Sequence, residues 1–179
     1  MSAQISLSVQ GQIISCTTEN TSDLFCKFSF HAGQEWSIIS GIDDGVTQSS
    51  RVNDERTAIW NFPLEIVYQS PKPSGWPQLI IAVYGENRFG NESVVGYGAV
   101  HVPLQPGHHE MNVPLFSRAP SSFTQRLKSW FTGSMPESIS FNFIAGSESR
   151  EIIKSESLGF VTASFDVILS GLKKLDYYV

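Results

Sequence analysis

Apolar and polar residues alternate with a period of two along much of this chain. In residues 60–69, for example, every second residue from Trp60 to Tyr68 is apolar. The same pattern occurs at residues 5–9, 24–30, 111–115 and 161–169. Because successive side chains of a β-strand point to opposite faces, each stretch predicts a strand with one buried and one exposed face.

Other strand-like stretches carry additional signals. Residues 79–84 are apolar on both faces, which predicts a central strand covered on both sides or one that faces a partner. Residues 94–104 form another strand pattern, in which Gly96 and Gly98 indicate a bulge or a close approach of another backbone. Pro63 has no N–H to donate, so it predicts an edge position or a bulge in its own strand.

Turn residues separate these stretches, at Ala32-Gly33, Asp43-Asp44-Gly45, residues 71–75 and Pro106-Gly107. Short strands that alternate with such turns are typical of antiparallel sandwiches. A chain of 179 residues suits one domain of this kind. The pattern therefore predicts an all-β fold, an antiparallel β-sandwich of about eight strands in a single domain spanning residues 1–179.

One short amphipathic helix is expected to interrupt the strands, at about residues 121–133. Ser122 and Gln125 have the spacing of a capping box, and Gly133 suits the C-terminal end of the helix. The apolar residues that fall on one helical face are Phe123, Leu127, Trp130 and Phe131. The helix would be an insertion before the last strand.

Two roles are open for this helix. It could cover one end of the sandwich, or it could present Trp130 and Phe131 to a protein partner or a membrane surface. Arg118, Arg126 and Lys128 lie in or beside it and are the candidate lipid-facing residues, since cations beside an apolar helical face favour contact with anionic lipid.

Composition narrows the classes of function. The net charge of −5 disfavours a nucleic-acid binder and broad attraction to anionic lipid. The first residues lack the pattern of a signal peptide, and no apolar run is long enough to span a membrane, so an intracellular protein is expected. Cys16 and Cys26 lie in apolar strand-like contexts, which predicts two buried thiols, although a disulfide between them stays open.

Metal and catalytic chemistry are not expected. A calcium site needs six to eight oxygen ligands. The carboxylates near predicted loops are Asp43, Asp44, Asp54, Glu55, Glu86 and Glu92. Asp43, Asp44 and Asp54 could lie at the same end of the sandwich as Glu86, but the loop after residue 85 adds only Glu92, with Asn87 and Asn91 as weak neutral ligands. The Cys and His spacing fits no zinc site, and no nucleophile or phosphate-binding motif is present, so neither an enzyme nor a cofactor is expected.

The aromatic content is high for a closed sandwich of this size, with four Trp and twelve Phe. Either the core is rich in aromatic residues or some of them anchor an interface, where Trp and Tyr commonly contribute most to binding. The candidate structural or interface anchors are Trp60, Trp76, Tyr97, Trp130 and Phe131.

Several sequence blocks together resemble the B9-domain family, the C2-like domains of the ciliary transition zone. The resemblance covers roughly residues 9–175, and its most specific blocks are residues 75–78 (Gly-Trp-Pro-Gln) and 96–103. The other matching blocks are residues 23–27, 60–63, 83–85, 89–91, 129–131 and 159–161. Residues 75–104 are also similar to the strands around the third binding loop of calcium-binding C2 domains, but without the aspartates of that loop.

The resemblance implies a C2-like eight-stranded sandwich and a non-enzymatic scaffold subunit without a cofactor. Its partners would be two other B9-domain proteins, within a larger transition-zone assembly of tectonic and Meckel-syndrome proteins. That assembly is required for cilium assembly and for gating of ciliary membrane proteins. The expected location is the cytoplasm at the cilium base, at the transition zone and basal body and associated with the cytoskeleton. The alternative is a calcium-independent phospholipid-binding C2 module that recruits partners to the membrane there.

Overall fold

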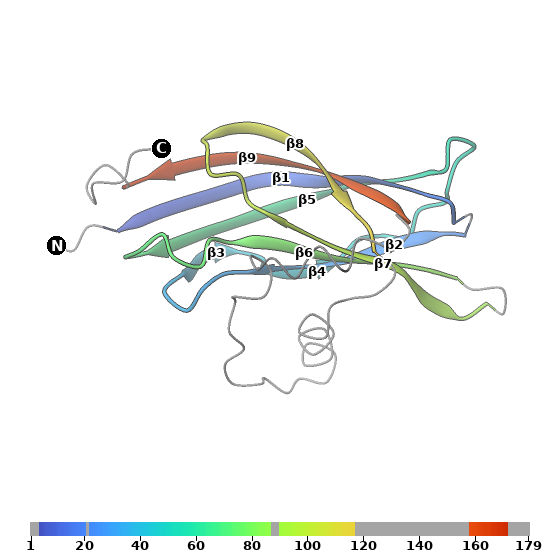
Figure 1. Ribbon diagram of the computed structural model, residues 1–179, viewed down its shortest axis with the longest axis horizontal. Coiled ribbons are helices and arrows are strands. Elements are labelled where there is room, and N and C mark those ends of the chain that lie inside the picture. The colour runs from blue at the N-terminus through green and yellow to red at the C-terminus, as the bar shows by residue number, and fades with distance from the viewer. Residues whose placement is uncertain (1–3, 21, 87–89, 117–157, 172–179) are drawn as a thin grey trace, which may run out of the picture.

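The computed structural model describes residues 4–20, 22–86, 90–116 and 158–171, and they form two packed antiparallel β-sheets (Figure 1). The described strands are β1 (Ile5–Thr18), β2 (Leu24–His31), β3 (Ser37–Gly41), β4 (Asp44–Val46), β5 (Thr57–Ser70), β6 (Gln78–Glu86), β7 (Glu92–His101), β8 (Gly107–Pro114) and β9 (Gly159–Ser170). In this part of the chain, no helix is long and apolar enough to cross a membrane.

One sheet has five strands in the order β3-β5-β1-β9-β8, and the other has four in the order β4-β2-β6-β7. The long strand β1 lies at the centre of the larger sheet, where it pairs with β5 on one side and with β9 on the other. Figure 1 shows the two layers, with β1, β5 and β9 in one and β2, β6 and β7 in the other. The edges on one side of the sandwich are therefore β3 and β4, which follow each other directly in the chain.

The core lies between the two layers and is built from the side chains that alternate inward. Before the middle of β1 the buried residues are the odd-numbered Ile5, Leu7, Val9 and Ile13, whereas after it Cys16 and Thr18 are buried. The register of β1 shifts between Ile13 and Ser15 against both neighbours. A bulge adds one residue to the strand, so it moves the following side chains to the opposite face. This bulge explains why a single period of two does not describe the whole strand.

Three local predictions are confirmed. Strand β6 is central in its sheet, and residues 78–83 are buried on both faces. Pro63 pairs with Gln12 of β1, while β3 pairs only with β5 residues beyond position 65, so the other side of Pro63 has no strand among the described residues. A bulge occurs in the ladder between β6 and β7 directly beside Gly96.

The strand count and one turn differ from the prediction. The described residues contain nine strands instead of about eight, and Asp43-Asp44-Gly45 is not a simple turn, because Asp44 begins β4. Strands β3 and β4 are short and mostly exposed edge strands, so burial gives them no alternating pattern. The helix expected at residues 121–133 lies outside the described residues.

Candidate functional site

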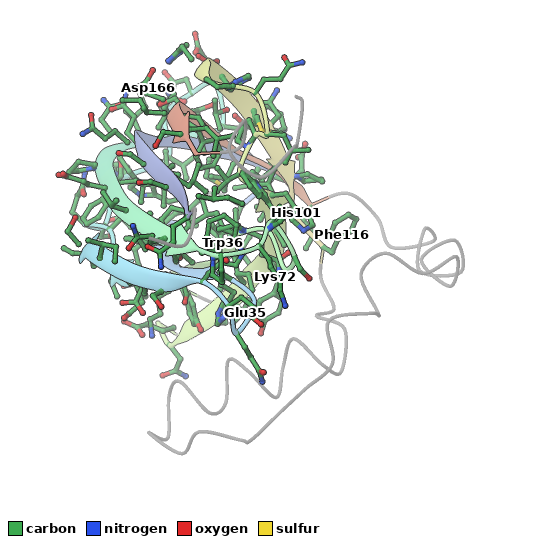
Figure 2. The ribbon with its side chains drawn as sticks, turned by 90° about the vertical axis from the view of Figure 1, so that its left-hand side faces the viewer. Glu35, Trp36, Lys72, His101, Phe116 and Asp166 are labelled. Carbon is green, nitrogen blue, oxygen red and sulfur yellow. The ribbon has the colours of Figure 1, made fainter. Side chains whose placement is uncertain are left out.

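Three aromatic rings close one end of the sandwich. The ring of Trp36, just before β3, packs edge-on against Trp76 at 5.2 Å and against Tyr68 at 6.1 Å between centroids. The indole N–H groups of Trp36 and Trp76 donate to the carbonyl oxygens of Ser74 and Val102. Figure 2 looks onto this end. The half-buried Trp76, a predicted anchor, thus joins the β5–β6 connection to the end of β7.

Trp60, another predicted anchor, lies inside the molecule. Its side chain is only 3% exposed, and its indole N–H donates to the carbonyl of Leu24 at 3.0 Å. This bond joins β5 of the larger sheet to β2 of the smaller one. The buried side chains of β5 are at even-numbered positions, so the alternating pattern itself places the ring of Trp60 in the core. The ring packs both layers together and has little surface left for a partner.

Tyr97 belongs to a different group of aromatic residues, on the outer face and β7 edge of the four-stranded sheet. We call this group the aromatic platform, and it comprises Phe25, Lys27, Tyr84, Tyr97 and Phe116. Phe25 and Tyr84 are paired across β2 and β6, and their rings stack at 5.2 Å with an interplanar angle of 9°. Lys27 Nζ lies 4.6 Å from the centroid of the Tyr84 ring, a cation–π geometry.

The β7 side of the platform is held by backbone pairing. Tyr97 and Phe116 exchange two backbone hydrogen bonds of 2.9 Å, which bring the end of the β8 segment alongside β7. Tyr97 is half-buried. Phe116 is exposed (Figure 2). Tyr97 is also the cross-strand partner of Ala82, which in turn pairs with Lys27. The three strands thus bring these side chains onto adjoining positions.

The Tyr84 phenol of the platform stays neutral at physiological pH. Burial raises the pKa of the Tyr84 phenol, and the nearby Tyr97, Glu92 and Cys26 raise it further. A neutral phenol can both donate and accept a hydrogen bond, while the ring offers apolar area. Half-buried aromatic rings with polar tips and a cation are the groups that commonly dominate protein interfaces. The arrangement can therefore bind by packing, hydrogen bonding and cation–π contact.

The carboxylates considered as calcium ligands do not meet at one place. The expectation that Asp43 and Asp44 could lie beside Glu86 is wrong, because Asp44 pairs with Ser29, which is opposite Ile80 near the start of β6, whereas Glu86 ends that strand. Asp54 lies in a loop at the end of the sandwich that contains Glu86, because Ser50 pairs with Leu24 and Leu24 pairs with Gly85. Among the described residues no group of three His, Cys, Asp or Glu side chains could hold a metal ion.

The basic side chains in the described part of the chain face carboxylates or aromatic rings. Arg56 pairs with Glu19, Lys72 lies 3.8 Å from Glu35, and Arg51 lies 4.0 Å from Asp23. Lys27 lies over the platform rings. The candidate lipid-facing residues Arg118, Arg126 and Lys128, and the candidate anchors Trp130 and Phe131, are outside the described residues.

The two cysteines are free and buried. Burial raises the pKa of the Cys16 thiol to about 12 and also raises the pKa of the Cys26 thiol. The expectation of two buried thiols is confirmed. Both thiols are protonated at neutral pH, so neither is a nucleophile there.

Comparison with known proteins identifies the family. The family model described as "Ciliary basal body-associated, B9 protein" matches residues 7–168. The chain is 46% identical to B9 domain-containing protein 1 of Xenopus laevis, over 96% of this chain and 87% of that protein. It is 31% identical to B9 domain-containing protein 2 of Mus musculus, over 90% of this chain and 91% of that protein.

Among solved structures, a C2 domain of plant extended synaptotagmin 1 aligns with a TM-score of 0.45 and 12% identity, over 96% of this chain and 97% of that one. The assignment to the expected family is based on the family model and on the sequence relatives, which match the same, largest part of the chain. This chain belongs to the B9 family of ciliary basal body-associated proteins.

Proposed function

We propose that this protein is a non-enzymatic scaffold subunit of the transition-zone assembly at the cilium base. In this role it assembles with two other B9-domain proteins, inside a larger complex with tectonic and Meckel-syndrome proteins. The complex would serve cilium assembly and the gating of ciliary membrane proteins. The subunit would act in the cytoplasm, associated with the cytoskeleton of the basal body.

The observation that carries this proposal is the aromatic platform. Its rings are half-buried or exposed on the outer face of a sheet, and its polar groups include the Tyr84 phenol, whose pKa is raised by burial, and the amine of Lys27. A surface of this kind suits a protein partner better than a small polar substrate. Two distinct B9 proteins match this chain over at least 90% of its length, so sister subunits with the same domain are natural partners.

The first test is co-purification of the full chain with its two sister B9 proteins, followed by mass measurement of the product in high salt. We expect a defined hetero-oligomer, because contact through aromatic and apolar area is insensitive to screening. Tyr97→Ala should weaken assembly by about tenfold or more, as expected for loss of an interface anchor. The matched control is His109→Ala on β8 of the other sheet. A stable lone monomer in the presence of both sisters would overturn the proposal.

The phospholipid-binding alternative predicts a different outcome. A lone chain that binds vesicles containing anionic lipid, and releases them as salt rises, would favour this alternative. Substitution of Arg126 and Lys128 would then abolish localisation at the cilium base and leave subunit assembly intact. Under the scaffold proposal, the same substitutions leave both localisation and assembly unchanged.

A further inference from the structure

A second surface lies on the side of the sandwich formed by β3 and β4. Nine large hydrophobic side chains are exposed among the described residues, and four of them fall within residues 38–46. We call this surface the β3–β4 edge, and its apolar residues are Ile38, Ile39 and Ile42. Val46 of β4 pairs with Lys27 and therefore lies on the face of the aromatic platform. Single exposed hydrophobic residues are ordinary, but a cluster on one edge marks a site of interaction.

Strand β3 is the end strand of its sheet, so among the described strands nothing pairs with its outer side. Exposed edges are normally protected by charged residues, by proline or by bulges. Within residues 37–41 there is no charged residue and no proline. A bulge is present between Ile38 and Ser40, which restricts pairing to a short segment. The strand therefore offers a short, uncharged edge to which another extended chain could be added.

The charges around this edge indicate the chemistry of the partner. Between Lys27 and Arg51 the charged residues are Glu35, Asp43 and Asp44, all acidic. The backbone carbonyl of Glu65 in β5 accepts the N–H of Ile42 at 3.0 Å, which places Glu65 next to this segment. The Glu65 side chain is exposed. Glu35 already has Lys72 nearby. The apolar edge is thus bordered by carboxylates, which favour a cationic partner and disfavour a second copy of this acidic chain.

We infer that the β3–β4 edge accepts an extended segment of a sister B9 subunit, one rich in β-branched apolar residues and flanked by Lys or Arg. The added segment pairs with β3 as a further strand of the five-stranded sheet, while its cations face Asp43 and Glu65. The inference rests on the proposed scaffold function. A subunit that holds two partners at once needs two surfaces, and β3 lies in the other sheet from the aromatic platform.

The test compares two matched substitutions in the full chain, assayed against each sister B9 protein separately. Ile39→Lys changes a side chain that is 58% exposed on β3, and Ile168→Lys changes one that is 66% exposed on β9, inside the same sheet. Ile39→Lys should weaken binding of one sister by about tenfold or more, because it removes apolar area and adds a cation that faces the cations of the partner. Ile168→Lys should bind both sisters as the wild type does, and both variants should keep the wild-type urea midpoint.

Hydrogen exchange supplies an independent readout. In the complex, the amides of residues 37–41 should exchange more slowly than in the free chain, because new strand pairing protects them. The inference is overturned if the complex forms but Ile39→Lys binds normally and these amides stay unprotected. It is also overturned if the edge instead mediates a homodimer that Ile39→Lys abolishes. If the wild-type chain binds neither sister, the proposed scaffold function itself fails, and this inference fails with it.

Discussion

At the scale of single residues, the tryptophans in the described part of the chain act as ties between separate segments. Trp36, Trp60 and Trp76 each donate the indole N–H to a backbone carbonyl at least 26 positions away in the sequence. A buried indole that lost its acceptor would leave a polar group unsatisfied, so these bonds fix the positions of the rings. Sequence marked tryptophan as important but could not separate a core ring from an interface ring, since both need the same apolar area.

Trp60 should therefore behave as a core residue. Trp60→Ala should lower the free energy of unfolding by about 3–5 kcal/mol, because it leaves a cavity between the sheets. Trp60→Phe keeps most of the ring and loses the bond to Leu24, whose carbonyl also accepts from Ser50, so its cost should be about 1 kcal/mol. Urea denaturation measures both values. Unchanged stability in Trp60→Ala together with weaker assembly would identify Trp60 as an interface anchor instead.

The buried thiols should make stability depend on alkaline pH. In the unfolded chain a cysteine ionises with a pKa near 8.5, whereas in the folded protein the pKa of Cys16 is about 12. Because the folded state keeps the proton longer, the contribution of Cys16 to stability is complete below the unfolded pKa. It is lost as pH rises toward about 12, at about 1.4 kcal/mol per pH unit.

Cys16→Ala removes this contribution, so the fall in unfolding free energy between about pH 9 and pH 11 should be shallower in the variant. Urea titrations under reducing conditions measure the two slopes. The cavity left by the substitution lowers stability equally at every pH and does not change the slope. Equal slopes would mean that Cys16 already ionises in the folded protein near its unfolded pKa.

At the scale of elements, β7 approaches the β8 segment so closely that only glycine fits at position 98. A Cβ there would lie 2.8 Å from the Pro114 carbonyl oxygen and 2.9 Å from Val113 Cγ1. Gly98→Ala should lower the unfolding free energy by about 1–3 kcal/mol, the usual cost of overpacking. At Gly96 the nearest atom would be Leu115 Cβ at 3.1 Å, so Gly96→Ala is the matched control with a smaller loss. Equal midpoints for Gly98→Ala and wild type in urea would contradict the close approach.

The period of two predicted the strands whose inner faces fill the core, because in such strands every second side chain is buried and therefore apolar. This holds for β2 and β5. Gly96 correctly marked a bulge and Gly98 a close approach of another backbone, while Pro63 marked a position with no described strand on its other side. The period of two failed for β3, where Ile38 and Ile39 are adjacent and both exposed. An edge strand pairs with one neighbour only and faces solvent or a partner on its other side, so packing in the core does not impose an alternating pattern on its sequence.

At the scale of the whole molecule, the topology separates acidic side chains that the sequence alone allowed to lie at one end of the sandwich. The chain turns from β3 to β4 beside the start of β6, so Asp43 and Asp44 lie near one end of the sandwich. The loop containing Asp54 returns to the other end, where β6 finishes at Glu86. Sequence alone could not place these loops, because their ends depend on strand register. The same topology sets β3 and β7 on opposite sides of the sandwich, which suits a subunit between two partners.

This separation predicts that calcium will not stabilise the fold. A ligand present at 100 times its dissociation constant stabilises the folded state by about 2.7 kcal/mol, which would raise the midpoint of thermal unfolding by several degrees. Glu86 and Glu92 pair across the β6–β7 ladder, and Asp54 lies in a loop at the same end. Among the described residues these carboxylates do not come together as a group of three that could hold a metal ion, and calcium requires six to eight oxygen ligands. Thermal unfolding with calcium and with chelator should therefore give the same midpoint. A midpoint that rises with calcium in the wild type, and no longer does so in Glu86→Gln, would show that the loops of this end assemble a site after all. Assembly with the sister subunits should likewise be unaffected by chelator, because the contacts proposed for the aromatic platform and the β3–β4 edge use apolar area, backbone pairing and side-chain charge.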